Sequence, residues 1–286
     1  MVYFIEVEHD SRIALFQRDP IMLPSPGRRS GAGPICSGAA RGRSDILRYA
    51  IIIPVHDEAD NVEPLLAEIR SVLDGTADAP AEILFVDDGS RDGTAELLAP
   101  HVDGEKVRVI RLARRCGKSA ALLTGARAAR SPWIVTMDGD RQNDPRDVPR
   151  LIAAARSASG EQPALVAGLR AKRRDTWARR FASRFANGLR KTLLGDDCPD
   201  TACGLKLMRR DAFLALPYFD GLHRFFPALF KIHGHPVAFL PVNDRPRERG
   251  SSKYGNLSRA VVGLADLLGV MWLRLRSTLP APRGPE

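Results

Sequence analysis

The sequence lacks two features that would take a protein into or across a membrane. No apolar run in its 286 residues reaches the roughly 18 residues that a spanning helix needs, because the best candidate, 260–273, is short and contains Asp266. The apolar core of a secretory signal is also missing near the N-terminus, where Glu6, Glu8 and Asp10 interrupt the apolar residues. We therefore expect a cytosolic protein that meets a membrane only at its surface.

The sequence also has few cysteines, and they are not spaced like metal ligands. Cys36, Cys116, Cys198 and Cys203 show neither CxxC spacing nor a nearby pair of histidines. A structural zinc site needs such a pattern, and disulfide frameworks belong to short secreted chains. We therefore expect reduced thiols.

A phosphate-binding P-loop is missing as well, although Gly117-Lys118-Ser119 looks like the end of one. The P-loop pattern requires glycine at the position of Leu112. Basic side chains before the expected helix could still contact a phosphate through charge and free backbone N–H groups, or could form a solvated basic turn. These side chains are Arg111, Arg114, Arg115 and Lys118.

Positive charge is in excess, with 43 Lys and Arg against 34 Asp and Glu and a formal net charge of +9. This balance indicates a polyanionic partner, which could be nucleic acid, an anionic lipid surface or a phosphorylated substrate. Charge alone does not choose among the three.

Beyond a Gly-, Pro-, Ser- and Arg-rich extension of about 47 residues, strand and helix patterns alternate four times. The extension has no periodicity, and we expect little packed structure in it. The alternation predicts an α/β fold with a mostly parallel, twisted sheet and helices on both faces. In such sheets ligands bind at the carboxyl ends of the strands. The loops that follow the expected strands should therefore share one rim: 54–58, 87–94, 113–118 and 138–145.

The acidic stretch after the fourth expected strand is the main candidate for chemistry. In extended chain Asp138 and Asp140 lie two residues apart, so both carboxylates point to the same side. Hard oxygen ligands at a strand end suit a divalent cation that holds a phosphorylated ligand. Asp-x-Asp by itself is also common in solvated turns, and its position on the rim favours a site.

The second half of the chain is basic and carries one apolar stripe. Trp177, Phe181, Phe185, Leu189 and Leu193 recur every four residues among arginines. This pattern fits a helix lying in an anionic membrane interface or an ordinary amphipathic helix packed on the core, and a base-stacking role fits the spacing less well. We also expect a basic closing loop at 243–254 and a last amphipathic helix, 256–275, with interfacial Trp and Arg at its end.

Four motifs follow one another along the chain: Ile53-Pro54-Val55-His56-Asp57-Glu58, Val86-Asp87-Asp88-Gly89-Ser90-Arg91-Asp92-Gly93-Thr94, Asp138-Gly139-Asp140-Arg141-Gln142-Asn143-Asp144-Pro145 and Gly250-Ser251-Ser252-Lys253-Tyr254. In this order they resemble the motifs of the family 2 inverting glycosyltransferases of the GT-A fold, and most closely those of the branch that acts on polyprenyl (undecaprenyl or dolichyl) phosphates. In the first motif Asp57 replaces the usual asparagine.

The resemblance implies a GT-A domain at 48–255, with an acceptor helix at about 175–193 and a C-terminal helix and tail at 256–286. It implies four groups of site residues. The nucleotide would contact Pro54, Glu58, Asp87, Asp88 and Lys118; Mg²⁺ or Mn²⁺ would bind Asp138, Asp140 and Gln142; the lipid phosphate would contact Arg170, Arg179 and Ser183; and the closing loop would supply Arg245, Arg247 and Lys253.

The resemblance further implies transfer of a sugar from a UDP- or GDP-linked donor to a polyprenyl phosphate at the cytoplasmic face of the membrane, with inversion. A phosphate acceptor is already anionic near neutral pH and needs little help from a general base. A sugar-hydroxyl acceptor would need one, for which Asp200 is the candidate. A basic nucleic-acid-binding protein is a remote alternative, because an acidic crevice repels phosphates unless a cation intervenes. A further alternative is an inactive homologue that acts as a scaffold, but the retained acidic motifs argue against it.

Overall fold

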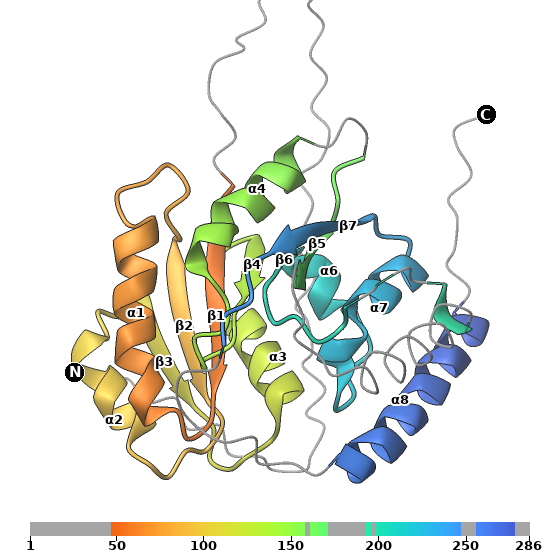
Figure 1. The fold of residues 1–286 in the computed structure, drawn as a ribbon, viewed down its shortest axis with the longest axis horizontal. Helices are drawn as coiled ribbons and strands as arrows, with labels where there is room; N and C mark the ends of the chain where they lie inside the picture. Colours follow the sequence, from red (N-terminus) through yellow and green to blue (C-terminus); the bar gives the residue numbers. More distant parts are fainter. Residues whose placement is uncertain are drawn as a thin grey trace, which may run out of the picture.

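The computed structural model describes residues 47–157, 161–170, 193–195, 198, 200–246 and 256–277 (Figure 1). The predicted N-terminal extension, nearly all of the predicted helix at 175–193 and the greater part of the predicted closing loop lie outside these residues.

The described residues form a seven-stranded sheet in the order β3-β2-β1-β4-β6-β5-β7. The neighbouring strands are parallel, except that β6 runs antiparallel to both β4 and β5. The predicted mostly parallel sheet is therefore confirmed. The strands are β1 (Tyr49–Val55), β2 (Glu82–Asp87), β3 (Val107–Arg111), β4 (Trp133–Thr136), β5 (Leu165–Arg170), β6 (Lys206–Arg209) and β7 (Val237–Val242).

The chain reverses its direction of travel across the sheet at β1. It proceeds from β1 to β2 and β3 on one side, and then returns to place β4 on the other side of β1. A doubly wound sheet opens a crevice at such a point, outside the carboxyl ends of the strands. The loops after β1 and β4 therefore flank the expected ligand site.

Helices cover both faces of the sheet, as predicted. Tyr49, Ile51 and Ile53 of β1 point into one buried cluster, which they share with α1 and α4, and Ala50 and Ile52 point into the other, which they share with α3, α6 and α7. A strand buried on both faces is apolar throughout, which explains the continuous apolar run in β1. The helices are α1 (Ala59–Leu73), α2 (Thr94–Leu98), α3 (Lys118–Ala128), α4 (Val148–Arg156), α6 (Arg210–Leu214), α7 (Phe226–Ile232) and α8 (Asn256–Arg276), with short 3₁₀ turns η1 (Ala99–His101), η2 (Pro145–Asp147) and η3 (Leu222–Arg224).

Close packing of α3 against the sheet depends on one glycine. A Cβ atom on Gly125 would lie 2.5 Å from Cγ2 of Ile52 and 3.1 Å from Cγ2 of Val86. The helix can approach β1 and β2 this closely only without a side chain at this position.

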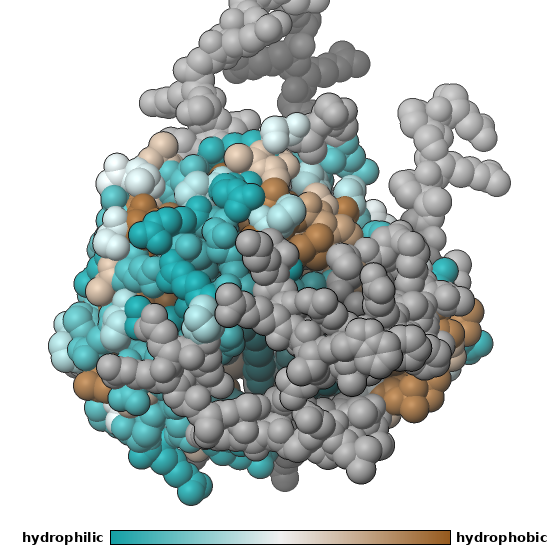
Figure 2. All heavy atoms as spheres, in the orientation of Figure 1, coloured by the Kyte–Doolittle hydropathy of each residue, from teal (hydrophilic) through white to brown (hydrophobic). Residues whose placement is uncertain are grey.

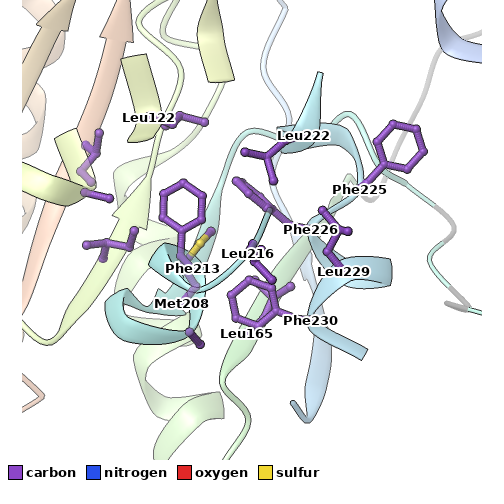
Figure 3. Packing of buried hydrophobic residues seen from close by; sticks show 14 of the residues in the cluster. Leu122, Leu165, Met208, Phe213, Leu216, Leu222, Phe225, Phe226, Leu229 and Phe230 are labelled. Atoms are coloured by element: carbon purple, nitrogen blue, oxygen red, sulfur yellow. The ribbon is translucent and has the colours of Figure 1, made fainter. Parts of the chain in front are cut away.

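An aromatic cluster joins α6 and α7 on the same side of the sheet (Figure 3). The rings of Phe213 and Phe226 meet edge to face with centroids 5.1 Å apart, and those of Phe226 and Phe230 do so at 6.5 Å. Such edge-to-face pairs stabilise a core beyond the area that they bury. Leu267 and Val270 of α8 belong to the larger buried apolar cluster on this side of the sheet, which attaches the last helix to the domain.

The other side of α8 is apolar and exposed. Leu264, Leu268 and Trp272, spaced four residues apart, are 52%, 48% and 60% exposed. Hydrophobic residues accordingly gather on the surface over α8, at the lower right of Figure 2. No helix within the described residues is long and apolar enough to span a membrane.

Candidate active site

A pocket opens at the carboxyl edge of the sheet, where the loops after β1, β2, β3 and β4 converge. Its lining consists of Pro54, Val55, His56, Glu58, Asp88, Arg115, Gly117, Lys118, Asp138, Gly139 and Asp140. The structure thus brings together six residues that the sequence analysis assigns to donor or metal, namely Pro54, Glu58, Asp88, Lys118, Asp138 and Asp140.

Asp88 fastens the loop after β2 to the start of α3. Its two carboxylate oxygens accept hydrogen bonds from the backbone N–H groups of Cys116 at 2.6 Å and Gly117 at 2.8 Å. Its neighbour Gly89 has a φ of +68°, and a Cβ there would lie 2.8 Å from the backbone of Arg114. Asp87 lies deeper, fully buried, and accepts from the backbone N–H of Ser90 at 2.9 Å. Asp87 therefore stabilises the conformation of the loop after β2 and does not line the pocket.

The loop after β1 holds Glu58 in a fixed orientation. Asn61 donates from Nδ2 to Oε2 of Glu58 at 2.6 Å, and the backbone N–H of Glu58 donates to Oγ1 of Thr94 at 3.0 Å. The preceding Asp57 has a φ of +52° and accepts from the backbone N–H of Arg91 at 3.0 Å. Asp and Asn are the side chains that tolerate this left-handed conformation best, so replacement of the usual asparagine keeps the turn.

Asp138 lies among cations. The ammonium group of Lys118 contacts its Oδ1, and buried Lys206 lies at the start of β6. Burial alone would raise the pKa of Asp138, but the charge and hydrogen bond of Lys118 and the charge of Lys206 lower it below its usual value. A Cβ on Gly204 would lie only 2.4 Å from this carboxyl group, so the absence of a side chain there makes room for it. The neighbouring ammonium groups consequently keep Asp138 in its anionic form.

Asp138 and Asp140 place two carboxylates, the hard oxygen donors that a divalent cation prefers, in the lining of one pocket. The ammonium group of Lys118 occupies one side of the first. Gln142 follows, with its backbone N–H donating to Oδ1 of Asp140 at 3.3 Å. Among the described residues no group of three or more His, Cys, Asp or Glu side chains is arranged to hold a metal. Further ligands for a cation would therefore have to come from other groups, such as the phosphates of a donor.

Arg245, at the start of the predicted closing loop, is anchored away from the pocket lining. Its guanidinium group is 2.7 Å from Oε1 of Glu68 and 2.7 Å from Oδ1 of Asp144. Its carbonyl oxygen accepts from Nε2 of Gln142 at 3.2 Å, which ties this segment to the acidic loop. Four other predicted site residues, Arg179, Ser183, Arg247 and Lys253, lie outside the described residues.

Arg170 and Asp200 form a two-pronged ion pair at the carboxyl end of β5. Nε of Arg170 donates to Oδ2 of Asp200 at 2.7 Å, and Nη2 donates to Oδ1 at 2.9 Å. The backbone N–H of Ala202 donates to Oδ1 at 3.1 Å. Burial opposes ionisation of Asp200, but the bonds and charge of Arg170 outweigh it, so the pKa of Asp200 lies below its usual value.

The sequence analysis missed two groups near Asp138, the buried Lys206 and the half-buried His223. Lys206 is 3% exposed and donates to the carbonyl oxygen of Cys203, and burial lowers the pKa of its ammonium group. Nδ1 of His223 lies 2.8 Å from Oγ of Ser119, and burial together with the neighbouring cations lowers the pKa of His223 to about 3. The position of Lys206 between Leu205 and Leu207, as a charged residue in an apolar strand, was a signal in the sequence that could have identified it. A lone histidine gave no comparable signal for the second.

Comparisons with known proteins bear on the family. The protein-family model described as Glycosyl transferase family 2 matches residues 50–216 of the sequence. The chain is 32% identical over 251 residues to the dodecaprenyl-phosphate galacturonate synthase of Rhizobium johnstonii, covering 81% of this chain and 70% of that protein. It is 33% identical over 207 residues to the undecaprenyl-phosphate 4-deoxy-4-formamido-L-arabinose transferase of Edwardsiella ictaluri. That match covers 72% of this chain and 62% of the relative, less than two thirds of its length.

Solved structures bear on the fold. Glucosyl-3-phosphoglycerate synthase from Mycobacterium tuberculosis, in complex with Mn²⁺, UDP and glucosyl-3-phosphoglycerate, matches with a TM-score of 0.60 at 18% identity. The match covers 79% of each chain. At this identity the likeness establishes the fold alone, and it confirms the predicted GT-A architecture.

Proposed function

The chain belongs to glycosyl transferase family 2 and is a glycosyltransferase, and we propose that it transfers a sugar from a nucleotide-sugar donor to the phosphate of a polyprenyl phosphate. The relatives named above are synthases or transferases of polyprenyl-phosphate sugars, which supports this acceptor. The observation that carries the proposal is the engagement of Asp200 by Arg170.

A hydroxyl acceptor requires a base within reach, and Asp200 suits that role poorly. Both of its oxygens accept hydrogen bonds from Arg170, and its lowered pKa makes it a weak proton acceptor. A phosphate acceptor is ionised at neutral pH and brings its own nucleophilic oxygen. The paired Asp200 therefore favours phosphate over hydroxyl.

The principal task of the site is then to bring two anions together. Lys118 and Arg115 line the pocket beside the carboxylates, and Lys206 lies buried behind them. These cations would offset the charge of the donor diphosphate and of the departing nucleotide. Glu58 and Asp88, held rigidly by Asn61 and by the start of α3, would orient the nucleoside. Arg170 would keep Asp200 in place and turn its remaining N–H groups toward the acceptor phosphate.

Asp138, Asp140 and Gln142 would hold Mg²⁺ or Mn²⁺, which when bound supplies positive charge to the diphosphate and to the leaving group. The low pKa of Asp138 keeps this ligand ionised. The ammonium group of Lys118 would leave Asp138 and contact the donor phosphates, because it can pair with either anion. A single displacement at the anomeric carbon would give inversion.

The exposed stripe of α8 would place the enzyme on an anionic bilayer at the cytoplasmic face of the membrane. Leu264, Leu268 and Trp272 offer an apolar face, and Arg276 lies at its end. A lipid-linked acceptor presents its phosphate at the membrane surface, so a site that serves it benefits from a helix in the same interface.

Transfer to lipid phosphate is tested by incubating the protein with radiolabelled UDP- and GDP-sugars, Mn²⁺ or Mg²⁺, and undecaprenyl phosphate. The expected product carries the label into organic solvent, and undecaprenol, which lacks the phosphate, serves as the matched control acceptor. Absence of an extractable product with every donor would refute the proposal.

The hydroxyl-acceptor alternative is tested with Asp200→Asn. If the acceptor is a phosphate, we expect the transfer rate to fall by about tenfold or less, because Arg170 is displaced. The pH profile of the rate should be unchanged. Loss of a general base costs on the order of 10² to 10⁴ in rate and removes the acidic limb of the profile. Asp211→Asn, in an exposed pair with Arg209, is the matched control.

Docking on a membrane is tested by sedimentation with vesicles of phosphatidylglycerol and phosphatidylcholine. The triple replacement of Leu264, Leu268 and Trp272 by Ser should release the protein from the pellet. Leu97→Ser, which removes an apolar residue of 37% exposure on another surface, is the control and should leave binding unchanged. Equal sedimentation of all three proteins would argue against docking through α8.

A further inference from the structure

The inner side of α8 carries a carboxylate in an unusual setting. Asp266 is half-buried, and among the described residues its Oδ2 has no hydrogen-bond partner. Nη1 of Arg224 lies 3.8 Å from Oδ2, beyond hydrogen-bonding distance. Burial accordingly raises the pKa of Asp266 above its usual value. A buried carboxylate oxygen without a hydrogen-bond partner is unfavourable for folding, so its presence requires another explanation.

Asp266 lies directly against the segment that precedes η3. A Cβ on Gly221 would lie 2.7 Å from Oδ2 of Asp266, so only glycine permits this approach. Gly221 also has a φ of +88°, which favours glycine a second time. The contact between α8 and this segment is therefore close and directional, unlike the apolar contacts of Leu267 and Val270.

The same segment contacts the beginning of α3 on its far side. The backbone N–H of Gly221 donates to Oγ of Ser119 at 3.1 Å, and Nδ1 of His223 lies 2.8 Å from the same oxygen. Ser119 is fully buried, and the preceding Lys118 contacts Asp138 in the pocket. A continuous set of contacts thus runs from α8 to the donor pocket.

We propose that Asp266 is a positioning residue that couples the seating of α8 on the membrane to the arrangement of Gly221–Arg224 and of the α3 N-terminus in the donor pocket. The inference rests on the membrane docking proposed above. Apolar contacts let a helix slide or rotate, whereas a carboxylate against Gly221 and Arg224 fixes the rotation of α8 about its axis. A bilayer that holds the outer stripe in place would hold Asp266, Gly221 and Ser119 in place with it.

Hydrogen–deuterium exchange with and without vesicles of phosphatidylglycerol and phosphatidylcholine tests this coupling in the full chain. In the wild type we expect vesicles to slow exchange in α8, in residues 219–225 and in residues 115–122. The slowing in the last two segments should be on the order of 5- to 100-fold, the usual range for coupled sites. In Asp266→Asn, which keeps the shape and removes the charge, only α8 should be protected.

Arg224→Gln breaks the same contact from the other side and should give the result of Asp266→Asn. Asp266→Asn should melt at or above the wild-type temperature, because an unfavourable buried charge is removed, whereas Arg224→Gln should melt lower, because the carboxylate loses the cation beside it. A lower melting temperature in both variants, with unchanged vesicle-dependent protection, would mark Asp266 as a purely structural residue and refute the inference.

The outcomes separate the inference from the function on which it rests. Protection of α8 alone in the wild type would keep membrane docking and refute the coupling. No protection anywhere would refute both docking and coupling. Transfer to undecaprenyl phosphate in detergent is measured on the same samples, and its presence or absence bears on the proposed reaction alone.

Discussion

The two halves of the sheet build the candidate site in different ways. From β1 to β4 the site residues lie at the end of a strand or in the loop after it, and the acidic loops meet at one edge because the strands are parallel. From β5 to α8 the pattern is mixed, because Arg170 ends β5, whereas Asp200 precedes β6, Lys206 begins it and His223 lies in η3. The site residues of the first half can be located by identifying the strands in the sequence and then inspecting the residues at their C-terminal ends.

The second half escapes that rule because β6 is antiparallel. Lys206 pairs with Thr136 at the end of β4, so the beginning of β6 reaches the crevice. Gly204, just before it, gives the carboxyl group of Asp138 its space. Residues in front of an antiparallel strand belong to the same edge as residues behind a parallel one. Functional groups of this kind must be sought on the N-terminal side of such a strand.

The largest effect should come from the first half. Asp140→Ala removes a proposed metal ligand without touching the buried clusters, and we expect transfer with Mg²⁺ or Mn²⁺ to fall by about 10³-fold or more. The fold should persist, as circular dichroism and melting temperature will show. Unchanged turnover would remove Asp140 from the metal site, and Asp144→Ala, four residues along the same loop, controls for a local disturbance.

A large effect in the second half should come from Lys206→Met, which keeps the length and removes the charge. We expect donor affinity to fall by about 10- to 100-fold, roughly 1.4 to 2.7 kcal/mol, because a buried cation near Asp138 is lost. Stability should stay equal or rise, since the desolvated ammonium group disappears. A stability loss with unaltered donor titrations would make Lys206 a packing residue.

Gly125→Ala should lower the stability of the buried core without changing the candidate site, unlike the two preceding variants. Its new methyl group would lie 2.5 Å from Ile52, and we expect a loss of about 1 to 3 kcal/mol in the free energy of unfolding through overpacking. Chemical denaturation measures this loss. Gly263→Ala, where a Cβ meets nothing within 4 Å, is the matched control.

Near neutral pH the smallest effect should be a pH dependence due to His223. Its pKa is about 3 in the fold and 6.5 ordinarily, so between these values the unfolded chain binds a proton that the folded chain does not. Stability should therefore fall as pH drops below 6.5, by about 1 kcal/mol per pH unit. His223→Asn should flatten this slope, whereas surface variant His101→Asn should leave it. A slope identical in all three proteins would contradict the assignment.

The sequence predicted the architecture of the first half because local periodicity determines it. The apolar run of β1 and the spacing of Val62, Leu65 and Leu66 in α1 were sufficient for that part of the fold. The convergence of Asp88, Asp138 and Lys118 followed from parallel topology. The Arg170–Asp200 pair and the His223–Ser119 contact join residues 30 and 104 positions apart through β6 and η3, and no local pattern encodes them.

The position of β6 also has a consequence for the order of folding during synthesis. In the described part of the chain β5 and β7 join the rest of the sheet through β6 alone, yet β6 is made after β5. Until residue 209 leaves the ribosome, β4 has an open apolar edge and β5 has no partner. The first four strands can form a nascent layer by themselves, and that unpaired edge is the place where another chain would add a strand. Slowing translation between β5 and β6 should therefore prolong the aggregation-prone stage more than slowing it elsewhere.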